Sequence, residues 1–311
     1  MSVVRLEKIV KRYADVLAVD KIDLNIEAGE IYGLLGPNGA GKSTLINIIC
    51  DSISKDSGSV YLFDQLLDKK SMHLKNDIGV VPQNIAIYDD LTAEENVHFF
   101  ASLYGLKKKE LKDRTAQALD FVGLTDHRKK KPKTFSGGMK RRLNIACAIA
   151  HRPKLIIMDE PTVGIDPQSK NHILNAVKKL NDQGSTVIYT THLMEEAEFL
   201  CSRIGIVDHG RVIAEGTKEE LQSIVTDKKQ IRITSDISSE IMPLALEEIK
   251  GVLNVTRQDQ YIDIECTKES DNITEIVLKL SEENIKIKDI QLKGVSLEMA
   301  FLSLTGRRLR D

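Results

Sequence analysis

A glycine-rich segment near the N-terminus limits the folds open to this chain more than any other feature. Residues Gly36–Thr44 read GPNGAGKST and match the pattern GxxxxGK[ST]. They follow the apolar run Ile31–Leu35, a predicted strand, and lead into a predicted helix over Ser43–Cys50. A loop of this composition between a strand and a helix is the setting in which the pattern binds phosphate groups. The sequence therefore predicts an α/β fold with a phosphate site at the start of that helix.

Each residue type in this loop has a separate predicted role in binding a nucleotide. Glycines permit positive φ angles and let backbone N–H groups come close to an anion. Those N–H groups and the helix N-terminus bind phosphate. Lys42 is predicted to reach the β- and γ-phosphates of a nucleotide and Ser43 to ligate Mg²⁺. The candidate nucleotide-binding residues of the loop are Gly36, Pro37, Asn38, Gly39, Ala40, Gly41, Lys42, Ser43 and Thr44.

A second segment, Leu155–Glu160, reads LIIMDE and combines a strand that is apolar on both faces with two carboxylates at its end. Ligands of open α/β sheets bind at the carboxyl ends of the strands. We therefore expect Asp159 to hold Mg²⁺ through its water shell. Glu160 is expected to orient and deprotonate an attacking water.

A third segment, Phe135–Met139, reads FSGGM and precedes the helical run Lys140–Ala150. Ser136, Gly137 and Gly138 are small residues at a helix start, which predicts a second anion-binding N-terminus. One nucleotide does not need two such sites within one chain. The second site therefore requires an explanation of its own.

The first half of the chain alternates short apolar runs with helical patterns, which predicts a mostly parallel sheet. The predicted strands are Val3–Ile9, Ile22–Ile26, Ile31–Leu35, Ser59–Phe63, Ile78–Pro82, Leu155–Met158, Thr186–Thr190 and Arg203–Asp208. Between Leu91 and Lys133 this signal gives way to two or three helices, including Ala93–Leu103 and Lys108–Val122. We expect a helical subdomain over about residues 91–150. The basic runs in it are either a solvated face or a patch that faces a membrane surface or a partner.

The pattern changes after Val225, where the polar segment Thr226–Gln230 is a predicted linker. The order of elements beyond it, βαββαβ, predicts a small α+β domain of the ferredoxin-like kind, with its first helix over Ser239–Lys250 and a final helix near Leu297–Leu304. The predicted domains are a nucleotide-binding domain over residues 1–225 and an accessory domain over residues 226–311.

Composition excludes several classes of protein. Lys and Arg number 44 against 46 Asp and Glu, which gives a net charge of −2. The chain therefore lacks the excess positive charge with which many proteins bind nucleic acid. No window reaches the roughly 18 continuous apolar residues that span a bilayer. The four cysteines are far apart and form no CxxC pair, which favours reduced thiols in a cytoplasmic protein. No NKxD guanine-binding motif is present, which disfavours a GTPase.

In this combination and order, the motifs resemble those of the nucleotide-binding subunits of ATP-binding cassette (ABC) transporters. The resemblance covers about residues 1–220. The matching motifs are the phosphate loop Gly36–Thr44, the glutamine loop at Gln83, the signature Ser136–Met139, the magnesium strand Leu155–Glu160, the loop with Asp166, and the switch histidine His192. Phe135 departs from the pattern, since the family usually has leucine before the signature, but one apolar residue replaces another.

The resemblance implies an ATPase that uses ATP and Mg²⁺. It implies that Gln83 contacts Mg²⁺ and the attacking water and that His192 reaches the γ-phosphate. It implies that Tyr13 stacks on the adenine ring and that Asp166 lies at a subunit contact. In the family two cassettes pair head to tail, and each signature caps the ATP held by the other phosphate loop. The second anion site is thereby explained, and the implied partner is a second copy of this chain.

Three stretches of sequence resemble the drug and antibiotic exporter branch of that family. They are Gly33–Leu45, Glu195–Ala197 and the tail Ser296–Gly306. This branch works with separate membrane subunits of the ABC-2 type, which implies a cytoplasmic chain held at the inner face of the cell membrane. The implied function is to drive export of a lipophilic drug, antibiotic or amphiphile, with residues Asn84–Asp90 as the candidate contact to the permease. Export of sodium, lipid or polysaccharide and a regulatory role without transport are the alternatives.

Overall fold

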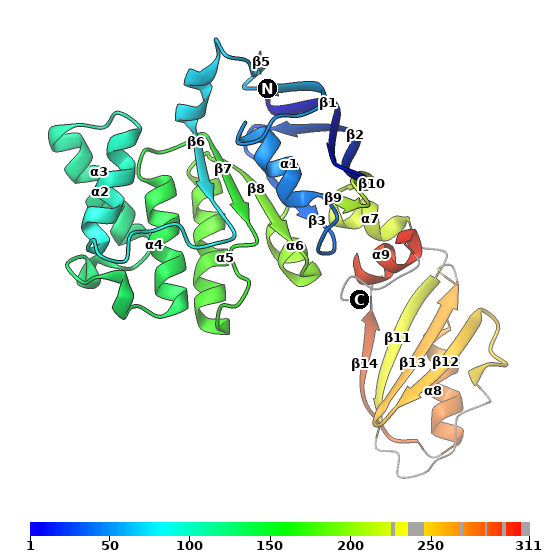
Figure 1. Cartoon of the computed structure of the whole chain (residues 1–311). Helices are drawn as coiled ribbons and strands as arrows, with labels where there is room; N and C mark the ends of the chain where they lie inside the picture. The colour runs from blue at the N-terminus through cyan, green and yellow to red at the C-terminus, as the bar shows by residue number, and fades with distance from the viewer. Residues whose placement is uncertain are drawn as a thin grey trace. The chain divides into compact units, whose positions relative to one another are not determined.

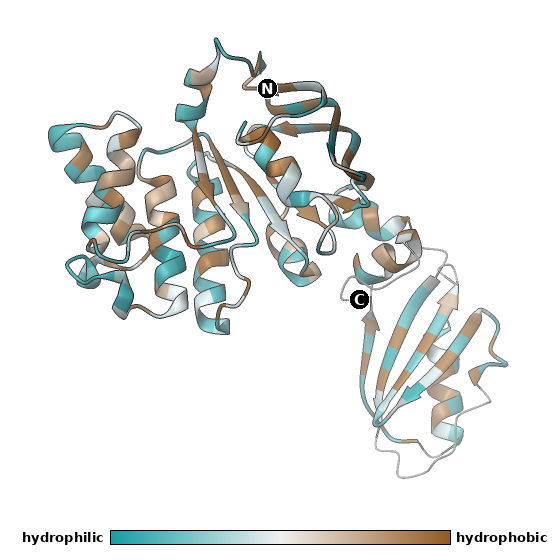
Figure 2. Ribbon diagram, viewed as in Figure 1, coloured by the Kyte–Doolittle hydropathy of each residue, from teal (hydrophilic) through white to brown (hydrophobic). Residues whose placement is uncertain are grey.

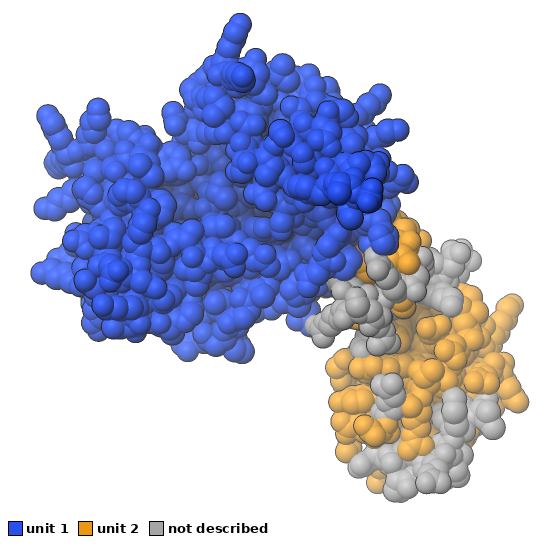
Figure 3. Space-filling model, viewed as in Figure 1, with its two compact units in different colours: residues 1–217, 309–311 blue, residues 218–308 orange. Residues whose placement is uncertain are grey.

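The computed structural model describes residues 1–224, 228–235, 246–267, 270, 272–283, 285–293 and 297–305. The chain divides into two compact units, of which the first contains residues 1–217 and the second contains the described part of residues 218–308 (Figure 3). Helix α7 (Lys218–Ser223) packs against helix α9 (Leu297–Thr305), so this helix belongs to the second unit. The sequence prediction puts the domain boundary later, after Val225.

The first unit is built on a six-stranded sheet with strand order β10-β9-β3-β8-β7-β6 (Figure 1). Its strands are β3 (Ile31–Leu35), β6 (Ile78–Val81), β7 (Leu155–Asp159), β8 (Thr186–Thr191), β9 (Arg203–Asp208) and β10 (Arg211–Gly216). Neighbouring strands are parallel except for β10, which runs antiparallel to β9. The predicted α/β fold with a parallel sheet is confirmed.

The central strands are buried on both faces, as their continuous apolar sequences predict. In β7, Leu155 and Ile157 pack into one hydrophobic cluster, whereas Ile156 and Met158 pack into another on the opposite face. Strand β7 is accordingly hydrophobic from Leu155 to Met158 and ends in Asp159 (Figure 2). Because the central strands are parallel, the loops that follow them meet at one edge of the sheet.

A separate antiparallel sheet of four strands accompanies the six-stranded sheet. Three of its strands were predicted as part of the mostly parallel sheet, and the short fourth strand, β5 (Gln65–Leu66), was not predicted. This sheet has the order β2-β1-β4-β5. Its strands are β1 (Ser2–Tyr13), β2 (Val16–Glu27), β4 (Ser57–Leu62) and β5 (Gln65–Leu66). The assignment of Val3–Ile9, Ile22–Ile26 and Ser59–Phe63 to the parallel sheet is therefore wrong. The physical reason is the two-residue turn between Tyr13 and Val16, because so short a connection joins only antiparallel strands.

Helices α2 (Ala93–Leu103), α3 (Lys108–Phe121) and α4 (Gly137–Ile149) pack together beside the sheet (Figure 1). Thr92 begins α2 with a capping box, in which its hydroxyl accepts from the Glu95 N–H and the Glu95 carboxylate accepts from the Thr92 N–H. The other helices of this unit are α1 (Lys42–Ile49), α5 (Pro167–Asp182), α6 (Met194–Leu200) and the short 3-10 helices Met72–Asp77, Thr125–His127 and Pro132–Thr134.

The second unit contains an antiparallel sheet with the order β12-β13-β11-β14. Its elements are β11 (Lys228–Ser235), β12 (Val252–Gln258), β13 (Tyr261–Thr267), α8 (Ile273–Glu282) and β14 (Ile287–Lys293). Hydrophobic and polar residues alternate along these strands, and Ile276 and Leu280 of α8 contribute to the buried core (Figure 2). This arrangement agrees with the predicted ferredoxin-like order. Most of the predicted helix Ser239–Lys250 lies outside the described residues.

Within the described residues, no helix combines the length and the apolar character that crossing a membrane requires. The four cysteines are free, and Cys147 and Cys266 are buried.

Candidate active site

A cavity of about 520 Å³ lies at the edge of the six-stranded sheet where the parallel strands end. The phosphate loop follows β3, and the loops after β6, β7 and β8 contribute Gln83, Glu160 and His192 to the same cavity. Its lining residues are Val16, Leu17, Ala18, Asn38, Gly39, Ala40, Gly41, Lys42, Ser43, Thr44, Gln83, Glu160, Val163, His192, His209 and Gly210. The sheet topology thus brings together side chains that are more than a hundred residues apart.

Glycine is required in the phosphate loop because the backbone there packs directly against other backbone. Gly41 precedes helix α1 with φ of 105°, in the left-handed region that favours glycine. A Cβ atom at Gly41 would overlap the Ala18 carbonyl oxygen, and one at Gly36 would overlap the Val207 carbonyl oxygen. These glycines therefore hold the loop close to the strand β9 and the strand β2.

Lys42 is the first residue of α1 and its side chain is buried. Its Nζ donates hydrogen bonds to the carbonyl oxygens of Gly36 and Pro37 at 2.7 and 3.0 Å. The same Nζ lies 3.2 Å from Glu160 Oε1. A lysine ammonium group is thus held inside the loop that is predicted to bind phosphates.

Glu160 is the residue on which the polar groups of the cavity converge, although it is only 5% exposed. Its Oε2 accepts a hydrogen bond from Gln83 Nε2 at 3.1 Å, and His192 Nδ1 lies 3.5 Å from its Oε1. Its backbone has φ of 44°, an unfavourable conformation for a side-chain-bearing residue that is often found at functional sites. The three predicted catalytic residues Glu160, His192 and Gln83 are therefore brought together.

Asp159 lies next to this group but is not among the residues that line the cavity. Its Oδ1 accepts a hydrogen bond from Thr190 Oγ1 at 2.6 Å, and Thr190 Oγ1 in turn accepts from the Glu160 N–H at 2.8 Å. Thr190 therefore fixes both carboxylate residues at the end of β7.

The predicted magnesium ligands are Ser43, Gln83 and Asp159. In the parts of the chain that the structure describes, no group of three or more His, Cys, Asp or Glu side chains forms a metal site by itself. A donor set of one carboxylate with a hydroxyl and an amide oxygen fits Mg²⁺, which keeps several waters and takes further oxygen ligands from substrate phosphates.

Gly36 and Pro37 at the start of the phosphate loop do not line the cavity, and neither does the predicted adenine-stacking residue Tyr13. Tyr13 lies at the end of β1, is 45% exposed, and has Lys11 Nζ 5.4 Å from its ring centre. Its cross-strand partner Val16 does line the cavity. Adenine stacking on Tyr13 stays a prediction.

Sequence reasoning missed the lining residues that come from outside the motifs. Val16, Leu17 and Ala18 belong to the antiparallel sheet, and His209 and Gly210 belong to the turn between β9 and β10. The Gly210 N–H donates to the Ala40 carbonyl oxygen at 2.9 Å, which fixes that turn to the phosphate loop. These residues carry no motif, and only the chain's folding places them at the site.

The signature residues lie at a second place, where helices α4 and α5 begin. Ser136 caps α4 by accepting from the Met139 N–H at 3.2 Å, and Asp166 caps α5 by accepting from the Ser169 N–H at 2.9 Å. This hydrogen bond from Ser169 lowers the pKa of the Asp166 carboxyl. Gly138 packs so closely on Ser169 that a Cβ atom there would overlap the serine side chain. Ser136, Gly137, Gly138 and Asp166 are not among the residues that line the 520 Å³ cavity.

Helix α4 connects these two places through a buried arginine that sequence reasoning also missed. Arg141 is 3% exposed and donates from Nη1 to the Pro82 carbonyl oxygen at 2.7 Å and from Nη2 to the Gln83 carbonyl oxygen at 2.5 Å. Burial lowers the pKa of this guanidinium. One turn further, Asn144 Oδ1 accepts from the Ala86 N–H at 3.0 Å. The loop with Gln83 is therefore fixed to the helix that begins at the signature.

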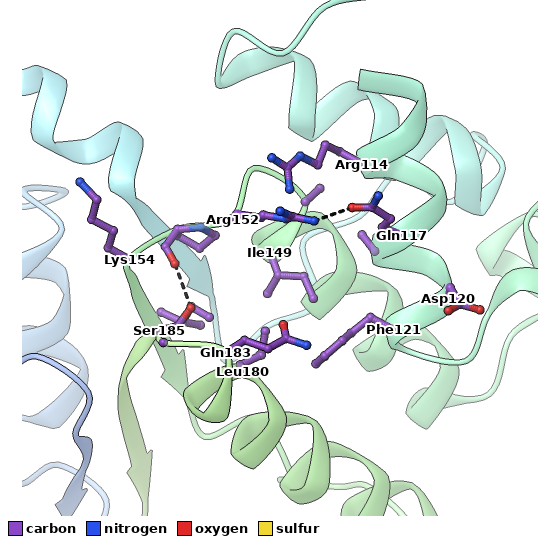
Figure 4. A pocket seen from close by; sticks show the side chains of 15 residues that line it. Arg114, Gln117, Asp120, Phe121, Ile149, Arg152, Lys154, Leu180, Gln183 and Ser185 are labelled. Atoms are coloured by element: carbon purple, nitrogen blue, oxygen red, sulfur yellow. Dashed lines mark hydrogen bonds between the residues drawn. The ribbon is translucent and has the colours of Figure 1, made fainter. Parts of the chain in front are cut away.

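A further cavity of about 590 Å³ lies at the opposite edge of the sheet, where β7 and β8 begin (Figure 4). Arg152 donates to Gln117 at 2.9 Å and Ser185 donates to the Pro153 carbonyl oxygen at 3.0 Å along its walls. None of the predicted site residues lines this cavity. The candidate active site is therefore the cavity at the carboxyl edge.

A phosphate loop at the end of a buried parallel strand, with a buried lysine and an adjacent carboxylate, defines a nucleotide-hydrolysing cassette. Residues 19–163 match the ABC transporter family. The linearmycin resistance ATP-binding protein LnrL of Bacillus subtilis (strain 168) is 46% identical over 307 residues, 98% of this chain and 99% of that protein. The daunorubicin/doxorubicin resistance ATP-binding protein DrrA of Streptomyces peucetius is 34% identical, over 97% of this chain and 92% of that protein.

A similar solved structure is the dimeric post-hydrolysis state of the ATP-binding cassette MJ0796 bound to ADP and Pi. It is 32% identical, with a TM-score of 0.63 over 69% of this chain and 98% of that chain. The chain belongs to the ABC transporter family and is an ATPase that uses ATP and Mg²⁺.

Proposed function

We propose that this chain is the ATP-hydrolysing subunit of an exporter for a lipophilic antibiotic or a related amphiphile. The observation that carries the proposal is the length of the similarity to resistance proteins. LnrL and DrrA match over 98% and 97% of the chain, and so include the second unit, whereas the MJ0796 cassette matches only 69%. A shared accessory domain favours a shared role more strongly than the ATPase cassette, which many transporters have in common.

The proposed chemistry follows from the side chains that converge in the carboxyl-edge cavity. Lys42 and the N–H groups of the phosphate loop bind the β- and γ-phosphates. Glu160 accepts a proton from the attacking water, Gln83 orients that water, and His192 contacts the γ-phosphate. Ser43, Gln83 and Asp159 would hold Mg²⁺, which would supply positive charge to the phosphate oxygens. The Lys42–Glu160 ion pair, at 3.2 Å, holds these two groups next to each other.

The proposed partner is a second copy of this chain. The signature lies outside the cavity that holds the phosphate loop, which favours a site completed by another cassette. In a two-fold dimer each signature, Ser136–Met139, faces the ATP of the partner, and Asp166 lies at the contact between the two copies.

The loop Asn84–Asp90 is the proposed contact to a separate permease of the ABC-2 type. Asn96, fully buried in α2, accepts from the Tyr88 N–H at 2.8 Å, and Lys140 of α4 pairs with Asp89 at 2.9 Å. The loop is therefore firmly attached, yet Ile85 and Tyr88 are 37% and 50% exposed. An apolar surface on a fixed loop suits a segment of a membrane protein, which would hold this chain at the cytoplasmic face of the membrane.

The decisive experiment replaces the chain in its source strain by the variant Glu160→Gln and measures susceptibility to a panel of lipophilic antibiotics. We expect the inhibitory concentration of at least one compound to fall 4-fold or more. Glu110→Gln is the matched control, because Glu110 is an exposed glutamate on α3 and has no place in the site. Unchanged susceptibility to every compound, in a strain whose chain has lost ATP turnover, would rule out drug export. Co-sedimentation with ribosomes instead of with membranes would point to a regulatory role.

A further inference from the structure

Glu196 of α6 is a buried carboxylate that the proposed chemistry does not use. It is 1% exposed, whereas its neighbour Glu195 points to solvent. Burying a carboxylate is costly unless the charge is paired and each oxygen is hydrogen-bonded. The contacts of Glu196 therefore indicate what the residue is for.

The two oxygens of Glu196 bind two different segments of the chain. Oε1 accepts from Thr162 Oγ1 at 2.7 Å and lies 2.9 Å from Lys170 Nζ, both in the segment that follows β7. Oε2 accepts from Tyr189 OH at 2.9 Å and from Thr191 Oγ1 at 3.0 Å, both on β8. One planar group thus links two segments that are neighbours at the carboxyl edge.

Each of these segments carries residues of the proposed site. Thr162 lies two residues after Glu160, and Lys170 follows within a turn of Asp166, the residue proposed at the dimer contact. Thr191 immediately precedes His192, and its Oγ1 also accepts from the Leu193 N–H at 2.9 Å, which holds the backbone on both sides of the histidine.

We propose that Glu196 is a positioning residue for ATP hydrolysis, which sets the place of His192 relative to Glu160 by linking the segment after β7 to the end of β8. The inference rests on the roles proposed for Glu160 and His192. It also gives a route by which a change at Asp166, caused by the arrival of the partner cassette, reaches His192 through Thr162, Lys170 and Glu196.

The chemistry of the site explains why the residue is a glutamate. All four partners donate a hydrogen or carry a positive charge, and a carboxylate accepts from all of them. Glutamine has the same shape, but its NH₂ group would face donors on one side and it would leave Lys170 without a counter-charge. Buried ion pairs contribute little net stability compared with apolar residues of the same size, so a role in fixing geometry accounts better for this one.

The test compares the full-length variants Glu196→Gln and Thr191→Val with a matched control. Glu195→Gln makes the same chemical change at an exposed position. We expect Glu196→Gln and Thr191→Val each to lower kcat for ATP about 10-fold with KM within 2-fold of the original value, because substrate binding is kept and geometry is lost. The double variant should be no slower than the slower single variant, since both changes break the same link. The control Glu195→Gln should stay within 2-fold of the original kcat.

Hydrogen–deuterium exchange of the nucleotide-free chain provides a readout that does not depend on turnover. In Glu196→Gln, we expect faster amide exchange in both segments 161–169 and 190–194, with no change in α2 and α3. The proposal would be overturned by an unchanged kcat in Glu196→Gln or by an equal kcat loss in Glu195→Gln. Faster exchange in one segment alone, or across the whole unit, would also overturn it. A separate result would show that the roles proposed for the site residues are wrong. In that case Glu160→Gln would keep the original ATP turnover, while the exchange result for Glu196→Gln would be unaffected.

Discussion

The contacts of Lys42 determine what its removal does. Its Nζ is held by the Gly36 and Pro37 carbonyl oxygens and by Glu160. Hydrogen bonds from a charged donor contribute roughly 1.5–3 kcal/mol. Because the same ammonium group is proposed to bond to the β- and γ-phosphates, Lys42→Ala is expected to weaken ATP binding by about 10- to 100-fold. Equilibrium titration with ATP checks this value. Lys69→Ala, a change at an exposed lysine, is the control, and equal affinities for the two variants would refute the phosphate-loop assignment.

His151 makes the stability of the fold depend on pH. Its ring stacks on Tyr104 with centres 3.5 Å apart, its Nε2–H donates to the Ile78 carbonyl oxygen at 3.1 Å, and burial lowers its pKa from 6.5 to about 4. The folded protein keeps this imidazole neutral, while the unfolded chain takes up a proton below pH 6.5. The contribution to stability is complete above pH 6.5 and is lost as the pH falls toward 4.

We expect the free energy of unfolding to fall by about 2–3 kcal/mol between pH 7 and pH 4.5 because of His151 alone. Urea unfolding of the original chain and of His151→Gln at both pH values measures this contribution. The glutamine amide can keep the bond to Ile78 but does not titrate, so the stability of the variant should depend less on pH. Equal pH dependence in the two proteins would contradict the assignment.

The residues of the site differ in how far sequence could predict them. Gln83, Glu160 and His192 each follow a strand pattern, and the strands of a parallel sheet end at one edge, so their meeting was predictable. Arg141 and Glu196 lie inside helices, where their neighbours in sequence give no sign of a polar partner. Their bonds to Gln83 and Thr191 depend on how α4 and α6 pack on the sheet, which only the folded structure determines.

At the scale of elements, the close packing of α4 on α5 depends on one glycine. A Cβ atom at Gly138 would overlap Ser169, whereas the nearest atom to one at Gly137 is 4.0 Å away. Gly138→Ala is therefore expected to destabilise the fold by about 1–3 kcal/mol through overpacking. Gly137→Ala should be neutral or stabilising, because alanine favours a helix.

Thermal unfolding of the two variants checks the difference, and the second-site change Ser169→Gly should restore part of the loss in Gly138→Ala. Equal stabilities of Gly137→Ala and Gly138→Ala would show that the helix starts are not in tight contact.

The elements themselves were predictable to different degrees. Helices α2 and α3 were predicted within a residue of their observed ends. The helical spacing of apolar residues continues over the length of each helix, and Thr92 is a clear N-cap for α2. Strands β1, β2 and β4 were predicted as strands but assigned to the wrong sheet. Apolar patterns identify a strand without naming its neighbour, and the pairing of β1 with both β2 and β4 involves contacts between residues far apart in sequence.

At the scale of the whole molecule, the separation of the signature from the phosphate loop decides how the active site is completed. Lys42 lines the 520 Å³ cavity and Gly137 does not, so a head-to-tail dimer would contain two sites, each built from both copies. This arrangement allows one inactive variant to rescue another. Lys42→Ala damages a copy's own phosphate loop, and Gly137→Glu damages only the signature it presents to its partner. A glutamate at the start of α4 favours the helix and would repel the partner's phosphates, so the variant should remain folded.

Each variant alone is expected to lack ATP turnover, because every site in its dimers has one damaged half. In an equal mixture about half of the dimers pair the two variants, and each of these has one intact site formed by the phosphate loop of one copy and the signature of the other. The mixture should therefore recover about a quarter of the original turnover per chain. A chain that carries both changes, mixed with Lys42→Ala or with Gly137→Glu, is the control, since no pairing then creates an intact site. If the mixture of the single variants is as inactive as each variant alone, the head-to-tail dimer is contradicted. In such a dimer, the mixed pairs must contain one intact site completed by the partner's signature.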